Sequence, residues 1–274
     1  PRGSQSSMLL TKQIEFAGLS SANNMPKGDA LGKIVYILPH EMFPFRIMVL
    51  ADSPINSVVE LKGKTIGMRR PNDVDATHIM TAGGGLAQSD YETLVVGPGV
   101  PGGAALKSGQ ADAIMGSVVD KTEIEASGIM LKELDLGDAG GLYNGGVATT
   151  KDILDNNRDL AVRFARAVAK GYIWMYENPE ASMELLGKVV PEAVQDPDTV
   201  LKLMHALSEV NHPLYDTLFH TTDEGWQKEI DLMVKVGILD KSFPASEVFT
   251  NDIVDEVFNF DVEALKEQAR SGKY

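Results

Sequence analysis

The feature that most constrains the fold of this chain is a loop–helix–strand unit that occurs twice. The second copy runs from Pro98 to Ser117. It has a Gly/Pro loop, a short helix ended by Gly109, and a buried strand from Ala113 to Met115. Five residues of this copy match the first copy at one constant offset: Leu9, Thr11, Gln13, Glu15 and Ser20 correspond to Leu106, Ser108, Gln110, Asp112 and Ser117. Two copies of such a unit predict two similar α/β lobes.

This unit suits the binding of a small polar ligand. The first N–H groups of a helix have no partner within the helix, so a Gly/Ser loop that leads into a helix offers donors to a ligand. In open α/β sheets, ligands bind beyond the carboxyl ends of the strands. Ser20, Ser21 and Ser117 lie at such ends, and residues 1–7 form the small-residue loop of the first copy. We therefore expect one ligand cleft with both lobes around it.

Composition excludes several classes of function. The 274 residues carry a net charge of -14 and show no basic stripe, which argues against a nucleic-acid partner. No apolar run approaches the ~18 residues of a membrane span. The sequence has no cysteine, which excludes disulfides, thiolate metal sites and cysteine nucleophiles within it. A hydrophobic content of 43% is enough for a sizeable core.

The order of predicted elements changes along the chain. Strands are expected at 14–19, 33–38, 45–51, 65–68, 91–96, 113–115, 129–134 and 147–149, with residues 39–41 separating the second strand from the third. A glycine-dense link is expected at 140–146. From Lys151 the pattern becomes helical, and we expect this helical tail to pack against the first lobe.

The start of the chain allows two interpretations. Pro1 already lies in the loop that should follow a strand, so we expect the chain to begin part-way through a domain, without a signal peptide. Residues 1–4 also resemble part of a protease-site tag. We favour native sequence, because Gly3 and Ser4 fall where the repeat requires a small-residue loop.

Two motifs resemble a known family. The segment Ser57 to Gly67, SVVELKGKTIG, resembles the start of the second lobe in periplasmic solute-binding proteins of ABC importers, in the branch that binds taurine, alkanesulfonates, nitrate and thiamine pyrimidines. The segment 105–113, ALKSGQADA, is similar to a second motif of that family, and 9–16 to its first-lobe equivalent. The resemblance covers nearly the whole chain.

The resemblance implies a type II two-lobe α/β fold. Each lobe would be a mixed sheet flanked by helices, with the ligand cleft between the lobes and two crossing strands, 45–51 and 147–149, as hinge. Residues 1–50 and 147–274 would form lobe 1 with the helical tail, and 51–146 lobe 2. The family has further residues before the position of Pro1, so part of the ligand shell would be missing. The implied protein is periplasmic, or anchored outside the membrane, and delivers a solute to ABC permease subunits as a monomer.

The candidate ligand-binding residues lie at strand ends, loops and crossovers. They are Gly3, Ser4, Gln5, Ser20, Ser21, Arg46, Arg69, Arg70, Asp73, Thr77, Ser117, Tyr143 and Asn144. For several of them the alternative to ligand binding is a structural role. That role is a salt bridge for Arg46, a helix cap for Asp73 and Thr77, and strand-end capping for Ser20 and Ser117.

The visible arginines favour an anionic solute. Arg46, Arg69 and Arg70 suit a sulfonate or an organic carboxylate, because guanidinium groups bind such anions bidentately. The alternative is a neutral thiamine-precursor pyrimidine, with Asp73 and Tyr143 as its contacts. We expect no metal and no cofactor, since the five histidines show no ligand spacing.

Two other functions remain open. A pyrimidine synthase-like enzyme would share the fold, but it would need a cysteine-rich motif that this sequence lacks. A ligand-sensing domain of a receptor would share both the fold and the binding site. No nucleophile-elbow, Walker or dinucleotide glycine motif is present, so we expect a binding protein and no enzyme.

Overall fold

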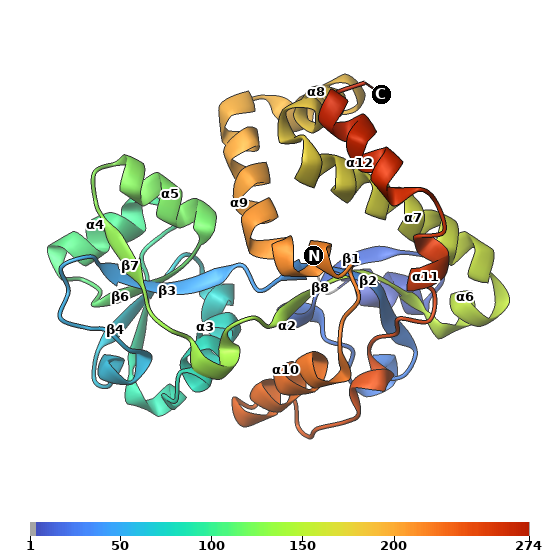
Figure 1. The fold of residues 1–274 in the computed structure, drawn as a ribbon. Helices are drawn as coiled ribbons and strands as arrows, with labels where there is room; N and C mark the ends of the chain where they lie inside the picture. Colours follow the sequence, from blue (N-terminus) through green and yellow to red (C-terminus); the bar gives the residue numbers. More distant parts are fainter. Residues whose placement is uncertain (1–3, 274) are drawn as a thin grey trace. The chain divides into compact units, whose positions relative to one another are not determined.

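The computed structural model describes residues 4–273, and the chain divides into two compact units (Figure 1). Unit 1 comprises residues 1–42, 144–223 and 245–274, and unit 2 comprises 43–143 and 224–244. This division places residues 43–50 and 224–244 in unit 2 and begins the return to unit 1 at Asn144. The lobes expected from the sequence placed 43–50 and 224–244 in lobe 1, and 144–146 in lobe 2. For 45–50 the difference arises because this strand pairs with strands of unit 2.

Unit 1 holds a three-stranded sheet in the order β1-β8-β2. Its strands are β1 (Ala17–Ser20), β2 (Ile34–Met42) and β8 (Tyr143–Thr150), and β1 runs antiparallel to β8. Residues 34–38 of β2 are all fully buried, as expected for a continuous apolar run in a sheet covered on both faces. Helices α1 (Ser4–Leu10) and α2 (Ser21–Asn24) flank β1 in the sequence.

The predicted break at residues 39–41 is wrong, because β2 continues through them to Met42. Pro39 is thus accommodated within β2, which lies at the end of the strand order. The predicted loop at 1–7 is also wrong from Ser4 onward, where α1 begins. The predicted link at 140–146 overlaps β8, since Gly145 and Gly146 lie within that strand.

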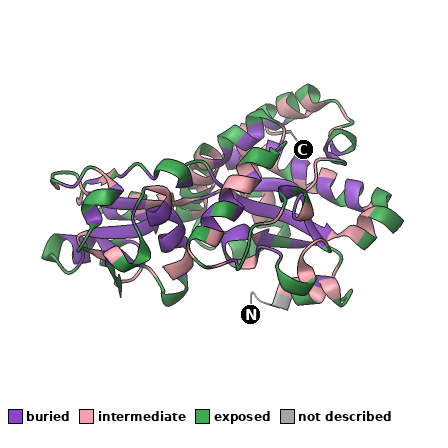
Figure 2. Cartoon of the chain, turned by 90° about the horizontal axis from the view of Figure 1, so that it is seen from below, coloured by how far each residue is buried: buried purple, intermediate pink, exposed green. Residues whose placement is uncertain are grey.

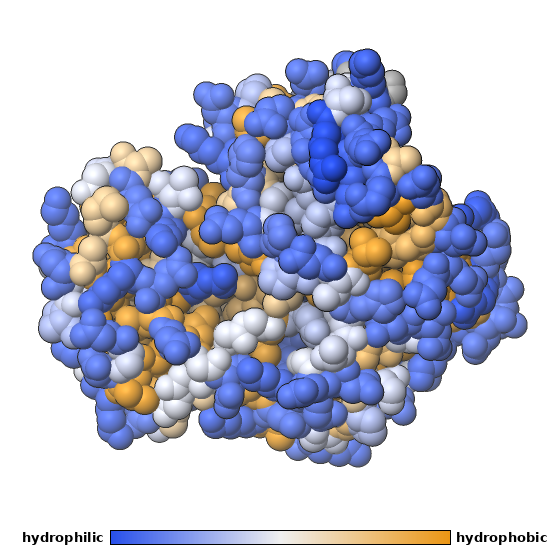
Figure 3. Space-filling model, viewed as in Figure 1, coloured by the Kyte–Doolittle hydropathy of each residue, from blue (hydrophilic) through white to orange (hydrophobic). Residues whose placement is uncertain are grey.

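The helical tail predicted from Lys151 is confirmed as helix. Unit 1 contains the helices α6 (Lys151–Asn156), α7 (Arg158–Glu177), α8 (Pro179–Val189), α9 (Pro197–Asp216), α11 (Val254–Val257) and α12 (Val262–Ser271). Helix α7 packs against α12, α8 and β2. The outer face of α12 is mostly hydrophilic (Figure 3), whereas Ala269 is fully buried.

Unit 2 holds a mixed five-stranded sheet in the order β5-β4-β6-β3-β7. The strands are β3 (Phe45–Leu50), β4 (Thr65–Met68), β5 (Glu92–Val95), β6 (Ala113–Ser117) and β7 (Leu131–Glu133). Strands β4, β5 and β6 are parallel to one another, and β3 is antiparallel to β6 and β7. The carboxyl ends of β4, β5 and β6 therefore lie at one edge.

Helices α3 (Val74–Gly83), α4 (Val100–Ser108), α5 (Val118–Ala126) and α10 (Asp223–Lys235) belong largely to unit 2. A core of Met48, Leu106, Ile114, Ile124 and Leu131 joins β3, β6 and β7 to α4 and α5. Helix α4 begins at Val100, inside the predicted Gly/Pro loop. It begins there because Pro101 fits a first turn and because Gly103 lets α4 approach α5 closely, where an added Cβ would lie 2.7 Å from Ile124 Cγ2. The strands of both units are mostly buried (Figure 2), except β5, whose residues are exposed.

Gly145 is required by the approach of β8 to β1. Its φ is +95°, and an added Cβ would overlap the Leu19 carbonyl oxygen and lie 3.0 Å from Ser21 N. We expect Gly145→Ala to lower the free energy of unfolding by about 2 kcal/mol, from backbone strain. Urea denaturation measures this loss. Gly18→Ala in β1 is the control, because its added Cβ would meet nothing within 4 Å. Equal stability of the two variants would contradict the prediction.

Candidate functional site

A chain of polar side chains connects the ends of the three strands of unit 1. Because β1 runs antiparallel to β8, the end of β1 at Ser20 lies opposite the start of β8. Ser20 Oγ donates to Asn144 Oδ1 at 3.0 Å, and Asn144 Nδ2 donates to Glu41 Oε2 at 3.0 Å. These bonds fix the orientation of the buried Asn144 amide. Glu41 keeps its second oxygen, Oε1, for another partner.

The Glu41 carboxyl is held in a partly desolvated position. Its side chain is 42% exposed, and Oε1 lies 3.8 Å from His40 Nε2, beyond hydrogen-bond distance. Burial raises the pKa of Glu41 above its ordinary value, and the hydrogen bond from Asn144 partly opposes that rise. A half-exposed carboxylate with an open oxygen can accept a hydrogen bond from a donor on a small molecule.

His40 lies beside Glu41 as a neutral imidazole. Burial lowers the pKa of His40 to about 4, against a raising contribution from its contact with the Leu38 carbonyl. Since a carbonyl oxygen only accepts, Nδ1 of His40 donates to Leu38 O at 3.1 Å, and Nε2 carries the free lone pair. The His40 ring also packs on Tyr172 of α7 at a centroid distance of 4.4 Å.

Side chains of helices α7 and α9 lie near His40 and Glu41 at the end of β2. Asn211 Oδ1 of α9 accepts from the Met42 N–H at 2.6 Å, which holds the end of β2. Burial raises the pKa values of Tyr172 and Tyr176, and the nearby Glu41 charge raises them further. Both phenols therefore stay protonated at neutral pH.

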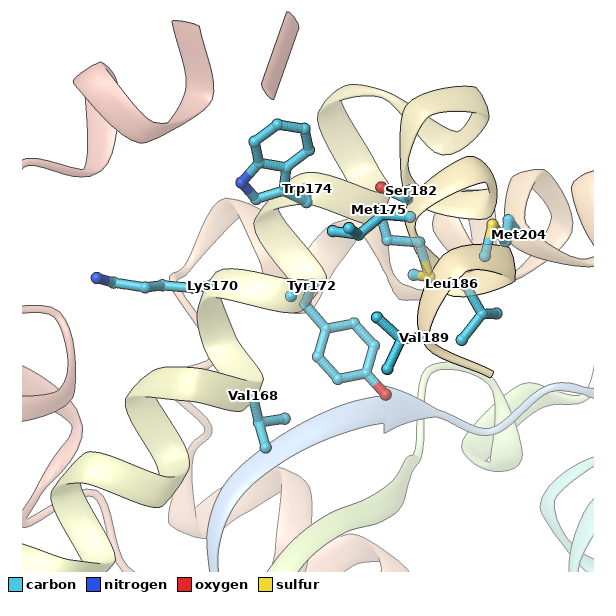
Figure 4. Close-up of a pocket in the computed structure, with 11 residues that line it drawn as sticks. Val168, Lys170, Tyr172, Trp174, Met175, Ser182, Leu186, Val189 and Met204 are labelled. Atoms are coloured by element: carbon cyan, nitrogen blue, oxygen red, sulfur yellow. The ribbon is translucent and has the colours of Figure 1, made fainter. Parts of the chain in front are cut away.

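An apolar pocket of about 610 Å³ lies among α7, α8 and α9 in unit 1. Its lining includes Val168, Tyr172, Met175, Leu185, Leu186 and Met204. Figure 4 shows the Tyr172 ring in this lining, reaching from α7 toward a strand. Tyr172 thus has one side in the pocket and contacts His40 of β2 as well.

In unit 2, Arg69 bridges two carboxylates at the carboxyl edge of the sheet. Its Nε and Nη2 each lie 3.0 Å from Asp73, a bidentate pair, and its Nη1 lies 3.5 Å from Asp120 Oδ2. The guanidinium also covers the Phe45 ring at 4.5 Å. All three charged side chains are nearly buried, at 13%, 9% and 8% exposure. Arg69 is therefore already neutralised within its own unit.

Three other predicted site residues of unit 2 make internal contacts. Arg46 pairs with Glu133 at 3.3 Å and donates to the Phe43 and Phe45 carbonyls. Thr77 Oγ1 donates to the Asp73 carbonyl within α3. Ser117 caps α5, accepting from Asp120 N and donating to its carboxylate. These contacts are structural, and a ligand role for the three residues stays a prediction.

The remaining predicted residues are dispersed. Gly3 lies outside the described residues, and Ser4 and Gln5 lie on α1. Arg70 is exposed, and Ser21 is fully buried at the start of α2. Tyr143 packs on Trp226 at 5.4 Å and leaves no room for a side chain at Gly225. Of the thirteen residues, the structure thus joins Ser20 to Asn144, and Asp73 to Arg69, Arg70 and Thr77.

Sequence reasoning missed Glu41, His40, Tyr172 and Asp120. Residues 39–41 were predicted to separate two strands, whereas His40 and Glu41 lie within β2. Tyr172 lies within the apolar pattern of α7, so it had no separate signal in the sequence. Asp120 had a usable signal, since Ser117-x-x-Asp120 has the spacing of a capping box, which α5 forms. In residues 4–273, no group of three or more His, Asp or Glu is placed to hold a metal ion.

A family model matches more than half of the chain, and two curated proteins are similar to it. Residues 2–182 match the family model described as NMT1/THI5 like. A riboflavin-binding protein, RibY, from Chloroflexus aurantiacus is 23% identical over 78% of this chain and 63% of its own length. A formylaminopyrimidine-binding protein from Halalkalibacterium halodurans is 28% identical over 51% of this chain and 43% of its own length. The chain thus spans less than two thirds of either curated relative.

Solved structures share the fold. The periplasmic aliphatic sulphonate-binding protein SsuA from Escherichia coli has a TM-score of 0.57 at 15% identity, over 90% of this chain and 84% of its own. A mutant of the desulfurization enzyme DszB in complex with biphenyl-2-sulfinic acid has a TM-score of 0.61 at 14% identity. The match covers 94% of this chain and 89% of the DszB chain. The type II periplasmic binding protein fold predicted from the sequence is confirmed. The fold serves both binding proteins and an enzyme. No helix in the described part of the chain is both long and apolar enough to cross a membrane.

Proposed function

Because this chain belongs to the NMT1/THI5-like family, we propose that it is the solute-binding component of an ABC importer. It would act outside the cytoplasm, in the periplasm or anchored to the outer face of the membrane, and pass its solute to the permease subunits. The observation that carries the proposal is the Ser20–Asn144–Glu41 chain, a fixed polar group at the strand ends of unit 1. We propose no catalytic activity for this chain.

We further propose a neutral heteroaromatic solute with N–H donors, the alternative that the sequence left open. Glu41 Oε1 is an acceptor without a hydrogen-bond partner among the described residues, and it suits a ring or exocyclic N–H. The curated relatives are named for riboflavin and a formylaminopyrimidine, which both carry such donors. A sulfonate or carboxylate, the solute class first expected, finds Arg46 and Arg69 already paired.

Titration calorimetry with three solute classes tests the function. The panel contains riboflavin and aminopyrimidines, alkanesulfonates, and aromatic carboxylates. We expect one flavin or pyrimidine to bind with a Kd of about 1 μM or lower, which corresponds to about 8 kcal/mol. Tight binding of a sulfonate or carboxylate alone would keep the transport function and overturn the solute class. Binding of none of the panel members would contradict both.

Replacement of Glu41 tests its role in solute recognition. We expect Glu41→Gln to weaken binding about tenfold, because the solute loses a hydrogen bond to a charged group. Glu184→Gln, an exposed acid on α8, is the control and should leave affinity unchanged. Wild-type affinity in Glu41→Gln would rule out this contact.

The same contact predicts a pH dependence. Only the carboxylate form of Glu41 accepts at both oxygens, and its pKa is raised. Affinity should therefore fall as the pH is lowered through that raised pKa, and the Glu41→Gln variant should lack this fall. The neighbouring His40, with a pKa of about 4, stays neutral over most of this range. Tyr172 and Tyr176 stay protonated throughout, because their pKa values are raised.

A further inference from the structure

We propose that His40 is a specificity-determining residue, which together with Glu41 selects a solute that carries an amino group with two hydrogens. This inference rests on the proposed solute-binding function and narrows its solute class, from any heteroaromatic ring with N–H donors to one with an exocyclic amino group. His40 Nε2 and Glu41 Oε1 are defined here as the acceptor pair. Both residues lie on β2 in unit 1.

The two atoms of the acceptor pair cannot satisfy each other. They lie 3.8 Å apart, and neither has a hydrogen-bond donor among the described residues. Nδ1 of His40 donates to Leu38 O, so Nε2 of the neutral ring has a lone pair and no hydrogen. Burial, which lowers the pKa of His40 to about 4, keeps the ring in this form at neutral pH. Since the Glu41 carboxylate also only accepts, the pair faces a position that lacks a donor.

Contacts within unit 1 hold the acceptor pair in place. Successive side chains of a strand ordinarily point to opposite faces, yet His40 and Glu41 converge at the end of β2. The His40 side chain is only 8% exposed, and its ring lies against Tyr172. Glu41 is held through its other oxygen by Asn144, which Ser20 holds in turn. Because these groups are already ordered, a solute that binds them loses little affinity to ordering them.

An amino group matches the acceptor pair in distance and in number of hydrogens. A hydrogen bond from nitrogen spans ~2.7–3.2 Å, so one nitrogen can reach two acceptors that lie 3.8 Å apart. An amino group brings one hydrogen for each acceptor. A ring N–H or a hydroxyl brings a single hydrogen, which leaves one acceptor unpaired at a cost in affinity. A carbonyl, carboxylate or sulfonate oxygen brings none and would face two lone pairs.

Two pyrimidines that differ only in the amino group test the acceptor pair. We expect wild type to bind 4-aminopyrimidine about 100-fold more tightly than 4-methylpyrimidine, about tenfold for each acceptor. His40→Phe keeps a ring against Tyr172 and removes Nε2, so it should lower this preference to about tenfold. That change corresponds to about 1.4 kcal/mol. Titration calorimetry of each protein with both compounds measures the two affinities and their ratio.

His205→Phe is the matched control, because it makes the same replacement at an exposed histidine of α9 and should keep the wild-type preference. The ratio of the two affinities is measured within one variant, so a general loss of folded protein leaves it unchanged. Circular dichroism verifies folding. An unchanged preference in His40→Phe would overturn the role of His40.

Wild type alone also tests the inference, without any variant. Equal affinity of wild type for the two pyrimidines would overturn the acceptor pair. Binding of riboflavin without binding of 4-aminopyrimidine would overturn the selection of an amino group and leave the proposed function standing. Binding of no member of the solute panel would contradict the proposed function as well.

Discussion

Replacement of Arg69 by methionine is expected to lower the stability of unit 2 by about 3–5 kcal/mol, the range for breaking a buried ion pair on one side. The reason is the pair of carboxylates that remains. Asp73 and Asp120, at 9% and 8% exposure, would face each other without a cation. Methionine fills a similar volume, so the loss reports charge and hydrogen bonding and very little packing.

Urea denaturation followed by Trp226 fluorescence measures this loss. Trp226 is fully buried and lies in unit 2, and a Trp174→Phe background removes the signal from unit 1. Arg70→Met is the matched control, because Arg70 is adjacent in sequence but exposed, so it should change stability by less than about 0.5 kcal/mol. Adding Asp120→Asn to Arg69→Met should restore part of the loss. Wild-type stability of Arg69→Met would show that the ion pairs of Arg69 with Asp73 and Asp120 do not stabilise unit 2.

Much of the fold was predictable because local patterns and tertiary structure agree. The turn at Gly109 has a φ of +74°, which explains why the short helix ends there in the sequence pattern. Helix α7 follows its apolar spacing from residue 158 to 177. The errors fall where packing outweighs local preference. Pro39 does not end β2, which continues to Met42.

The site was less predictable, because its geometry depends on which ends of strands meet. Ser20 and Asn144 were both singled out, yet only the antiparallel register of β1 and β8 joins them. Arg69 was expected to bind a ligand anion, and that contact stays a prediction. Its anionic partners in the structure are Asp73 and Asp120. The sequence does not reveal that Asp73 and Asp120 already fill that role, because Asp120 reaches Arg69 only through the fold.

Lowering the pH should destabilise unit 1 through His40. The pKa of His40 is about 4 in the folded chain, against 6.5 for an ordinary histidine. Between these values the unfolded chain binds the proton and the folded chain does not, so stability falls as the pH falls from 6.5 to 4. The full difference is about 3 kcal/mol, and about 2 kcal/mol of it appears between pH 7 and pH 4.5.

Urea midpoints at several pH values between 7 and 4.5 measure this slope. His40→Gln removes the titrating group and should flatten the curve, whereas His205→Gln, an exposed histidine on α9, should keep the wild-type slope. Glu41 acts in the opposite direction, because an acid with a raised pKa takes up its proton more readily in the folded chain and so gains stability as the pH falls. The His40→Gln variant should therefore become slightly more stable on mild acidification, where wild type loses stability. Identical curves for His40→Gln and wild type would show that the imidazole is not held neutral by burial against Tyr172 and Leu38.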